Sequence, residues 1–412
     1  MNPDVIIVGG GASGLFAACE IASKGKSVLV FEPNEKLGRK LRITGKGRCN
    51  LTNNCPPDEV VKNINKNPKF LYSALNKFTP QDTISWFEAN GVPLKTERGN
   101  RVFPASDKAD DIADALVNVA KKSGVKFIKE KVLSIIAENG EVVGVKCKSG
   151  NYLAKSVILA TGGASYPKTG STGDGYKMAR ALGHTITELK ASLVPIETVE
   201  DVSRFSALTL KNVTVTLKQQ GKKAPLFEKL GEITFMPYGV AGPLGISCSC
   251  LMTEENLLNQ AYSIYIDLKS GLTVEQLDKR ILRDISEIPN ISVEKLICKL
   301  LPKEMARALA YASKINPDKP CNQITKSERE ALCLTLKAYK LTPKALRSLD
   351  EAIITSGGVS IKEISPATME SKLVNGLYFT GEIIDCDAFT GGFNLQIAFS
   401  TAYVASCDVA LK

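Results

Sequence analysis

The chain has 412 residues, of which 44% are hydrophobic and 23% charged, and its formal net charge at pH 7 is +10. This composition excludes a disordered chain, and the length predicts two or three domains, because one hydrophobic core rarely serves so many residues. The moderate positive charge fits ordinary solubility as well as attraction to a polyanion such as RNA or a nucleotide phosphate.

Cysteine and histidine content narrows the chemistry. The sequence has 11 cysteines but no CxxC pair and no recognisable secretory signal, which predicts reduced thiols in the cytoplasm. The apolar start, residues 5–19, contains four glycines and is shorter than a membrane span, so no membrane association is expected. With His184 as the single histidine, no metal site is expected. Any difficult chemistry should therefore come from an organic cofactor.

Residues 4–32, DVIIVGGGASGLFAACEIASKGKSVLVFE, predict a strand, a helix and a second strand. Gly9, Gly11 and Gly14 follow the first strand as G-x-G-x-x-G, and Glu32 ends the second strand. Such glycines let a pyrophosphate approach the helix N-terminus, and the carboxylate accepts hydrogen bonds from a ribose hydroxyl. The order predicts a dinucleotide site and favours a ribose without a phosphate, as in NAD or FAD.

The next stretch, residues 36–57, is rich in cations and contains no carboxylate. We expect Arg39 and Lys40 to balance the two charges of a bound diphosphate, because six like charges would otherwise repel one another. Gly45 and Gly47 would let the backbone approach the cofactor ring closely. The alternative is an ordinary solvated loop. The six cations are Lys36, Arg39, Lys40, Arg42, Lys46 and Arg48.

Two later segments favour FAD over NAD. Residues 140–163 predict a hairpin that turns at residues 149–151, followed by a strand that ends in Ala-Thr-Gly. In two-dinucleotide-type flavoproteins such a strand closes the FAD domain near the cofactor. Residues 376–405 predict a strand, then Gly381-Glu382, a loop with Asp385 and Asp387, and a helix opened by Gly391-Gly392. The N-terminus of that helix can face the flavin pyrimidine and stabilise negative charge there.

The region between these segments has a different character. Residues 191–268 contain alternating runs typical of β-strands, such as KNVTVTLKQQGKK and AYSIYIDL. Residues 273–340 change to helical spacing, and each predicted helix begins at Thr, Ser or Pro. We interpret this region as a small β domain that carries a helical insert.

With these segments identified, the chain resembles the BaiN/RdsA-like family of NAD(P)/FAD-dependent oxidoreductases along nearly its whole length. One departure is the pair Met236-Pro237 before YGVAGP, where the family pattern has Thr-His. This departure puts in doubt any substrate chemistry that uses a histidine from that segment. The matching strings are GGGASGL, GRKLRITGKGRCNLTN, GNRVFPASDKA, ATGGASYPKTGSTGDGY, ALGH, LVPIET, GGVSIKEISPATMESKL and GEIIDCDAFTGGFNLQIAFS.

The resemblance implies an α/β fold: a two-dinucleotide-type Rossmann FAD domain built from both chain ends, with an inserted β domain that carries a helical subdomain. The expected boundaries are 1–190 for the first part of the FAD-binding domain, 191–270 for the β domain and 271–345 for the helical insert. Residues 346–412 would form the return of the β domain and the second part of the FAD-binding domain.

The resemblance also implies the reaction. It points to a reductase of an activated C=C bond, either in the uracil ring of ribosomal RNA or in a steroid or bile-acid enone. NADH or NADPH would be a transient electron donor, since a second G-x-G-x-x-G is not evident. Two alternatives stay open: a flavin-dependent amine oxidase that uses oxygen, and a non-catalytic, flavin-stabilised RNA-binding protein. The sequence leaves the oligomeric state open.

Cys49 has two interpretations. It is either a thiol that donates a proton to substrate, with a pKa lowered by neighbouring cations, or a small packing residue beside the flavin. We favour packing, and then the proton would come from Tyr166, Tyr238 or a bound water. The expected FAD-binding residues are Gly9, Gly11, Ser13, Gly14, Glu32, Arg39, Lys40, Gly45, Gly47, Arg48, Cys49, Asn50, Ala160, Thr161, Gly162, Gly381, Glu382, Asp385, Gly392, Phe393, Asn394 and Leu395.

Overall fold

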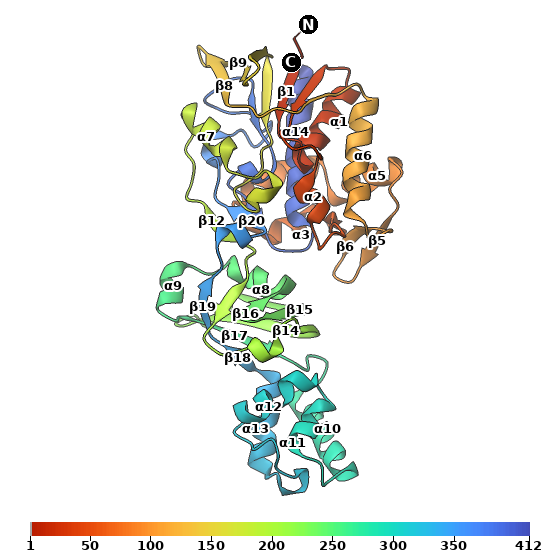
Figure 1. The fold of residues 1–412 in the computed structure, drawn as a ribbon, viewed down its shortest axis with the longest axis vertical. Helices are drawn as coiled ribbons and strands as arrows, with labels where there is room; N and C mark the ends of the chain where they lie inside the picture. Colours follow the sequence, from red (N-terminus) through yellow and green to blue (C-terminus); the bar gives the residue numbers. More distant parts are fainter. Residues whose placement is uncertain (1) are drawn as a thin grey trace. The chain divides into compact units, whose positions relative to one another are not determined.

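The computed structural model describes residues 2–412, which divide into two compact units (Figure 1). One unit comprises the chain up to Ser192 and from Ser348 onward, and the other is the continuous segment Leu193–Arg347. Each unit has its own hydrophobic core. The first unit is therefore assembled from both ends of the chain, and the second is inserted into it.

A five-stranded parallel sheet organises the first unit. Its order is β21 (Leu377–Phe379), β11 (Ser156–Leu159), β1 (Val5–Val8), β2 (Val28–Phe31) and β7 (Lys126–Ile128). All four residues of β1 are buried and apolar, as expected for a strand covered on both faces. The chain passes from β1 to β2 and β7 on one side, and then to β11 on the other side of β1. The strand order thus reverses between β1 and β11.

Three helices pack near the centre of this sheet. α1 (Ala12–Ser23) follows β1 and contacts both α6 (Ala109–Lys122) and α14 (Phe393–Leu411). Figure 1 shows α14, from the C-terminal end of the chain, beside α1 from the N-terminal end. The rings of Phe16 and Phe399 lie 5.3 Å apart between centroids, which joins the two helices through aromatic packing. The two chain ends therefore share one core.

Smaller elements complete the first unit. The predicted hairpin is confirmed as β9 (Glu141–Lys146) and β10 (Asn151–Leu153), which pair antiparallel in a three-stranded sheet with β8 (Ser134–Glu138). The remaining helices and strands are α2 (Arg39–Ile43), β3 (Thr52–Asn53), α3 (Pro57–Lys62), β4 (Ile64–Lys66), α4 (Pro68–Lys77), α5 (Pro80–Ala89), β5 (Leu94–Glu97), β6 (Arg101–Pro104), α7 (Asp174–Ala181), β12 (Lys190–Ser192), β20 (Ile354–Ser356) and β22 (Asp387–Ala388).

The second unit contains a seven-stranded antiparallel sheet in the order β18-β17-β14-β15-β16-β13-β19. The inward residues of β14 alternate with outward polar ones, which is the pattern that predicted β structure here. The strands are β13 (Ile196–Thr198), β14 (Thr209–Gln219), β15 (Phe227–Met236), β16 (Gly239–Ala241), β17 (Tyr262–Asp267), β18 (Tyr339–Leu341) and β19 (Pro343–Leu346), with helices α8 (Gly242–Ser249) and α9 (Glu254–Leu258).

Four helices lie between β17 and β18: α10 (Val274–Glu287), α11 (Val293–Cys298), α12 (Lys303–Ala312) and α13 (Lys326–Lys337). They begin at side-chain caps or at proline, since Thr273 caps α10, Ser292 caps α11 and Pro302 precedes α12. The boundaries differ from the predicted ones. The helices end at Lys337 rather than at 345, and β18 and β19 return to the sheet before residue 347. Helices and sheet also share one core.

The parallel sheet and the inserted unit confirm the predicted fold class. No helix among residues 2–412 is long and apolar enough to cross a membrane.

Candidate functional site

The carboxyl ends of the parallel strands bring several predicted site residues to one edge of the sheet. Gly9 follows β1, Glu32 follows β2, Ala160 follows β11, and Gly381 comes two residues after β21. Ligands of open parallel sheets bind at this edge, where the strand order reverses. In this sheet the reversal lies between β1 and β11, so the glycines and the Ala160 segment flank it.

The three glycines of the first loop have different tasks. A Cβ atom at Gly9, where φ is +111°, would lie 2.5 Å from the carbonyl oxygen of Ala160. A Cβ at Gly14 would lie 2.0 Å from the carbonyl oxygen of Gly9. Both glycines are therefore required for close packing of the strand, the loop and α1. A Cβ at Gly11, by contrast, would meet no atom within 4 Å, so the backbone borders open space there.

The N-terminus of α1 begins at this open space. Gly11 is its N-cap residue, no side chain caps the helix, and its first turn holds no acidic residue. An uncapped helix N-terminus carries a partial positive charge and backbone N–H donors. A glycine that leaves space in front of such donors fits the pyrophosphate of a dinucleotide.

Glu32 lies beside the same loop. Its carboxylate accepts a hydrogen bond from the backbone N–H of Gly10 at 2.9 Å and two from Asn34, through the backbone at 3.0 Å and the side-chain amide at 2.7 Å. These donors hold the acid in one orientation next to a hollow in the surface. The hollow is lined by Val8, Gly9, Phe31, Glu32, Pro33, Lys131, Val132, Thr161, Gly170, Thr172, Asp174 and Met178.

Several residues around this hollow were missed by sequence reasoning. Lys131 and Val132 follow β7, and the rule that ligands lie at the carboxyl ends of parallel strands would have found them. Lys131 forms an ion pair of 2.6 Å with Asp174 at the start of α7, which brings α7 to the β7 side of the hollow. The sequence signal for Lys131 was thus its position shortly after a strand. Its pairing with Asp174 could be seen only in the folded chain.

Two buried hydroxyls at this edge lack a partner in the described chain. They are Oγ1 of Thr161, which follows β11, and Oγ1 of Thr380, which follows β21. An unpaired buried hydroxyl costs about 1–3 kcal/mol, so such groups usually have a use. Their position at the strand ends, together with the open space at Gly11, fits a polar ligand at this edge.

The cationic stretch behaves differently from its prediction. Arg42 donates to Asp110 and, at 2.6 Å, to Asp114, and Lys36 lies 3.1 Å from Asp110. Both carboxylates come from α6, far along the sequence. Carboxylates of the chain itself therefore neutralise Lys36 and Arg42 without a bound anion, while the contact of Arg39 and Lys40 with a diphosphate stays a prediction.

Arg48 is another cation of this stretch that pairs within the protein. Its guanidinium contacts the carboxylates of Glu97 and Asp107 and lies 4.3 Å from the ring centroid of Phe103. These pairs raise the pKa of Arg48 and lower the pKa of Glu97, while the pKa of Asp107 is lowered by its hydrogen bonds with Lys95 and then Arg48. The predicted contact between Arg48 and the cofactor would have to compete with both carboxylates.

The loop that carries Arg48 forms a tight left-handed turn. Gly45, Lys46, Gly47 and Cys49 all have positive φ, between +58° and +82°. The N–H groups of Gly47, Arg48 and Cys49 donate to carbonyl oxygens of residues 43–45. The glycines serve this turn, and these three donors are used inside the loop. Close approach to a cofactor ring remains a prediction for Gly45 and Gly47.

Cys49 is fully buried, with 0% of its surface exposed. Burial raises the pKa of its thiol to about 12. The hypothesis that the neighbouring cations lower this pKa is wrong, because those cations face carboxylates and the thiol is cut off from water. Burial is what a packing residue would show, and the packing role of Cys49 stays a prediction.

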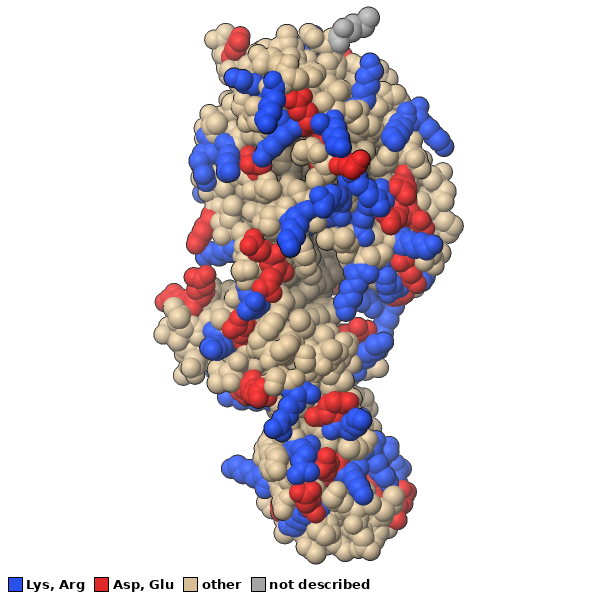
Figure 2. Space-filling model, in the orientation of Figure 1, with Lys and Arg blue, Asp and Glu red and all other residues tan. Residues whose placement is uncertain are grey.

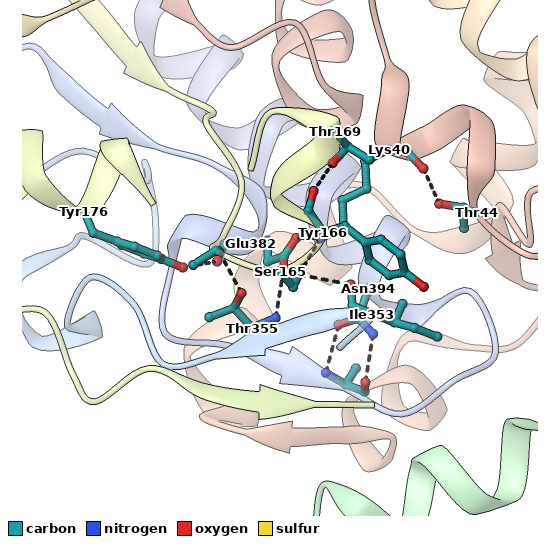
Figure 3. A network of polar contacts seen from close by, with 12 residues as sticks. Lys40, Thr44, Ser165, Tyr166, Thr169, Tyr176, Ile353, Thr355, Glu382 and Asn394 are labelled. Carbon is teal, nitrogen blue, oxygen red and sulfur yellow. Dashed lines mark hydrogen bonds and ion pairs between the residues drawn. The ribbon is translucent and has the colours of Figure 1, made fainter. Parts of the chain in front are cut away.

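Lys40 and Glu382 join two segments of the predicted site. Lys40 Nζ lies 2.7 Å from Glu382 Oε2 and 2.8 Å from Ser165 Oγ. The other carboxylate oxygen of Glu382 accepts hydrogen bonds from the backbone N–H of Thr355 at 2.8 Å and from Ser165 at 3.1 Å. Figure 3 shows this network. Lys40 and Glu382 are thus paired with each other. Arg39, from the same stretch, instead donates a hydrogen bond to Asn34 at 2.8 Å, beside Glu32.

The segment from Gly381 to Leu395 is largely buried. Asp385 is paired with Lys66 at 2.7 Å, and the amide of Asn394 is bonded to Ala388. A Cβ at Gly392, where φ is +94°, would lie 2.4 Å from the backbone of Thr52. Gly392 is also the N-cap of α14, which has no capping side chain and no acidic residue in its first turn. This second uncapped N-terminus is the feature of the segment that suits an anionic ring edge.

Other polar side chains near Gly392 also have hydrogen-bond partners within the protein. The side-chain amide of Asn50 is oriented so that its oxygen and its nitrogen both have partners. The oxygen accepts a hydrogen bond from the N–H of Gly392 at 3.1 Å, and the nitrogen donates one to the carbonyl oxygen of Thr52 at 3.2 Å. Ser13 of α1 donates to the carbonyl of Thr380 at 3.4 Å. Phe393 is buried. Asn50 and Ser13 therefore tie the start of α14 and the end of β21 to the rest of the predicted site.

Three further candidates are His184, Tyr238 and Tyr166. His184 is buried, its ring bonds to Glu363 and Ser371, and burial lowers its pKa, so its role is structural. Tyr238 belongs to the second unit, in the turn between β15 and β16, and the Arg347 guanidinium lies 4.7 Å from its ring centroid. Tyr166 is 36% exposed and lies next to Ser165 in the Lys40–Glu382 network.

A parallel sheet with a glycine loop, an uncapped helix after its first strand and an acidic residue after its second strand is typical of Rossmann-type dinucleotide-binding proteins. The family described as HI0933-like protein Rossmann domain matches residues 3–408. The chain belongs to this family and is a FAD-dependent oxidoreductase, as the sequence predicted.

Relatives match over almost their full length. The chain is 32% identical over 410 residues to a protein from Haemophilus influenzae named ribosomal RNA dihydrouridine synthase, covering 98% of each chain. It is 29% identical over 401 residues to the 3-dehydro-bile acid delta(4,6)-reductase of Clostridium scindens, covering 97% of each. Among solved structures, 3-ketosteroid delta1-dehydrogenase from Sterolibacterium denitrificans has a similar fold, with a TM-score of 0.54 at 15% identity, and 99% of each chain is covered.

Proposed function

We propose that this protein is a FAD-dependent reductase of a C=C bond conjugated to a carbonyl group, with NADH or NADPH as the electron donor. The observation that carries the proposal is the match over at least 97% of both chains to two relatives whose names describe the same chemistry on different substrates. A dihydrouridine synthase and a delta(4,6)-reductase each saturate a C=C bond.

The chain's own residues have defined tasks in this proposal. The N-terminus of α1 binds the pyrophosphate, Glu32 binds the ribose, and the uncapped N-terminus of α14 faces the pyrimidine edge. When bound, FAD supplies the hydride that such a reduction needs. The protein then has to deliver a proton to the neighbouring carbon and to stabilise negative charge on the carbonyl oxygen. The burial of Cys49 supports a packing role rather than proton donation, and we propose that the proton comes from another donor such as Tyr166, Tyr238 or a bound water.

The electron donor and the compartment belong to the same proposal. A second dinucleotide fingerprint is not evident in the sequence, so the nicotinamide would visit the flavin transiently. All 11 cysteines are free thiols, which supports a reducing compartment, and we place the protein in the cytoplasm.

The identity of the substrate is left to experiment, because charge does not choose between RNA and a steroid enone. The net charge of +10 suits RNA. On the face shown in Figure 2, however, Lys and Arg are interspersed with Asp and Glu rather than gathered in one stripe. The two substrate classes therefore enter the test as equal candidates.

The test is a half-reaction experiment on FAD-loaded protein. The flavin is reduced anaerobically with NADH or NADPH, and its reoxidation is followed after mixing with a uridine-containing ribosomal RNA fragment, a steroid dienone or buffer. We expect one of the two substrates to accelerate reoxidation at least ~100-fold over buffer. In a parallel aerobic arm without NADH or NADPH, amine turnover with uptake of oxygen would favour the oxidase. RNA binding without any reoxidation would favour the non-catalytic alternative.

A further inference from the structure

The two chain crossings between the units lead through one ribbon of the first unit. Ser192, the last residue of β12, directly precedes Leu193, where the inserted unit begins. β20 follows a few residues after the inserted unit ends at Arg347. β12 and β20 pair antiparallel, with Ser192 opposite Ile354. Whatever holds this ribbon therefore holds both connections to the inserted unit.

A buried carboxylate bridges the two strands of this ribbon. Asp387 is 0% exposed, and its two oxygens accept hydrogen bonds from one serine of each strand. Ser192 of β12 donates to Oδ2 at 2.7 Å, and Ser356 of β20 donates to Oδ1 at 3.3 Å. The side chain of Asn65 also bonds to Asp387, and Lys66 is paired with Asp385. Since an isolated buried charge is costly, hydroxyl and amide donors must compensate for it.

The segment that carries Asp387 holds the ribbon at a second point. Glu382 accepts the backbone N–H of Thr355 in β20 at 2.8 Å, and the single hydroxyl proton of Ser165 is shared between Glu382 at 3.1 Å and the carbonyl of Ile353 at 3.2 Å. Glu382 and Asp387 lie on the one stretch that runs from β21 to α14, between Gly381 and the α14 N-terminus. This stretch is also the candidate contact with the cofactor.

We propose that Asp387 is a positioning residue that latches the β12–β20 ribbon to the 381–395 segment, so that cofactor binding at this segment fixes the strands that carry the inserted unit. The Asp387 carboxylate accepts a hydrogen bond from each strand and therefore opposes their separation. It also moves with the 381–395 segment on which it lies. This coupling goes beyond the proposed reaction and does not depend on the substrate.

The test compares amide hydrogen exchange of the ribbon with and without FAD. In the wild-type protein, adding FAD should slow exchange of residues 190–193 and 353–357. Asp387→Asn keeps the size of the side chain but gives up one charged acceptor. In this variant the ribbon should exchange about tenfold faster, which corresponds to ~1.4 kcal/mol, and the protection by FAD should be lost although FAD still binds.

Two further variants keep the test decisive if Asp387→Asn does not fold. Ser192→Ala and Ser356→Ala each remove one donor and should each give part of the effect. Asp408→Asn is the matched control, because Asp408 also accepts a hydroxyl bond, from Tyr378 at 2.8 Å, at a site outside the ribbon. It should leave ribbon exchange unchanged. Wild-type exchange rates and FAD protection in Asp387→Asn, or in both serine variants, would overturn the proposal.

Discussion

Two glycine-rich loops of the first unit were both predicted to contact the cofactor, but they differ in where their backbone N–H groups are bonded. The loop at residues 9–14 ends at an uncapped helix, and Gly11 borders open space. The loop at residues 43–50 closes on itself, with the N–H groups of residues 47–49 bonded inside the loop. Two cations of this stretch, Arg42 and Arg48, are paired with carboxylates of the chain.

The comparison shows that glycine content alone does not identify a phosphate site. Glycine permits positive φ and close approach, and either property can serve the protein's own turn as well as a ligand. What distinguishes the first loop is that it leads into the N-terminus of a helix that no side chain caps, whereas the N–H groups of residues 47–49 are bonded inside their own loop. Substitutions in the two loops should therefore have different consequences, in the following order of size.

The largest effect is expected for Gly14→Ala. A Cβ there would lie 2.0 Å from the carbonyl oxygen of Gly9, so α1 or β1 must shift. We expect a loss of at least ~4 kcal/mol in the free energy of unfolding, seen as a collapse of the melting temperature. Gly25→Ala is the control, since its Cβ would meet no atom within 4 Å and it should cost only about 1 kcal/mol. Equal melting temperatures for the two variants would contradict this packing.

The next largest effect concerns Gly11→Ala. Its φ of −86° suits alanine and nothing lies within 4 Å, so the FAD-free protein should keep its stability to within about 1 kcal/mol. The added methyl group would occupy the place of the pyrophosphate. We expect FAD affinity, measured by flavin fluorescence, to fall at least ~100-fold, which corresponds to ~2.7 kcal/mol.

Gly47→Ala is the matched control in the other loop. Its Cβ also meets open space, but its φ is +82°, so the substitution should cost about 1 kcal/mol of stability through strain. FAD affinity should stay within about threefold of wild type. If Gly47→Ala weakened FAD as much as Gly11→Ala, the contrast between the loops would be wrong.

Cys49→Ala should have a moderate effect, and on stability only. Removing a fully buried sulfur leaves a small cavity and should lower the free energy of unfolding by about 1–2 kcal/mol. In single-turnover kinetics the rate per bound flavin should stay within about threefold of wild type. A general acid would lose about 10²–10⁴-fold, so a drop of that size at full FAD occupancy would falsify the packing role.

The smallest effect is expected for Arg48→Met. The guanidinium is over a third exposed, so its pairs with Glu97 and Asp107 are screened by water. We expect the melting temperature to fall by about 2 °C and FAD affinity to be unchanged. Calorimetry and a fluorescence titration separate these outcomes. A tenfold loss of FAD affinity would instead support the predicted contact between Arg48 and the cofactor.

Much of the first unit could be predicted from local patterns. The buried run of β1, the glycine spacing and the position of Glu32 each depend on residues close together in sequence. The hairpin of β9 and β10 followed from its turn residues for the same reason. The end of the helical insert was placed too late, because β18 and β19 are strands of only three and four residues whose pairing partners lie elsewhere in the chain.

The sequence by itself determined the βαβ unit, the class of cofactor and the family, because these are written in spacing and residue type along short stretches. Only the tertiary structure decided the partners of the charged groups. Asp110 lies 68 residues from Arg42, and Glu382 lies 342 residues from Lys40. Electrostatic neutralisation and burial depend on distance in space, so the charge of a stretch cannot be judged before the chain has folded around it.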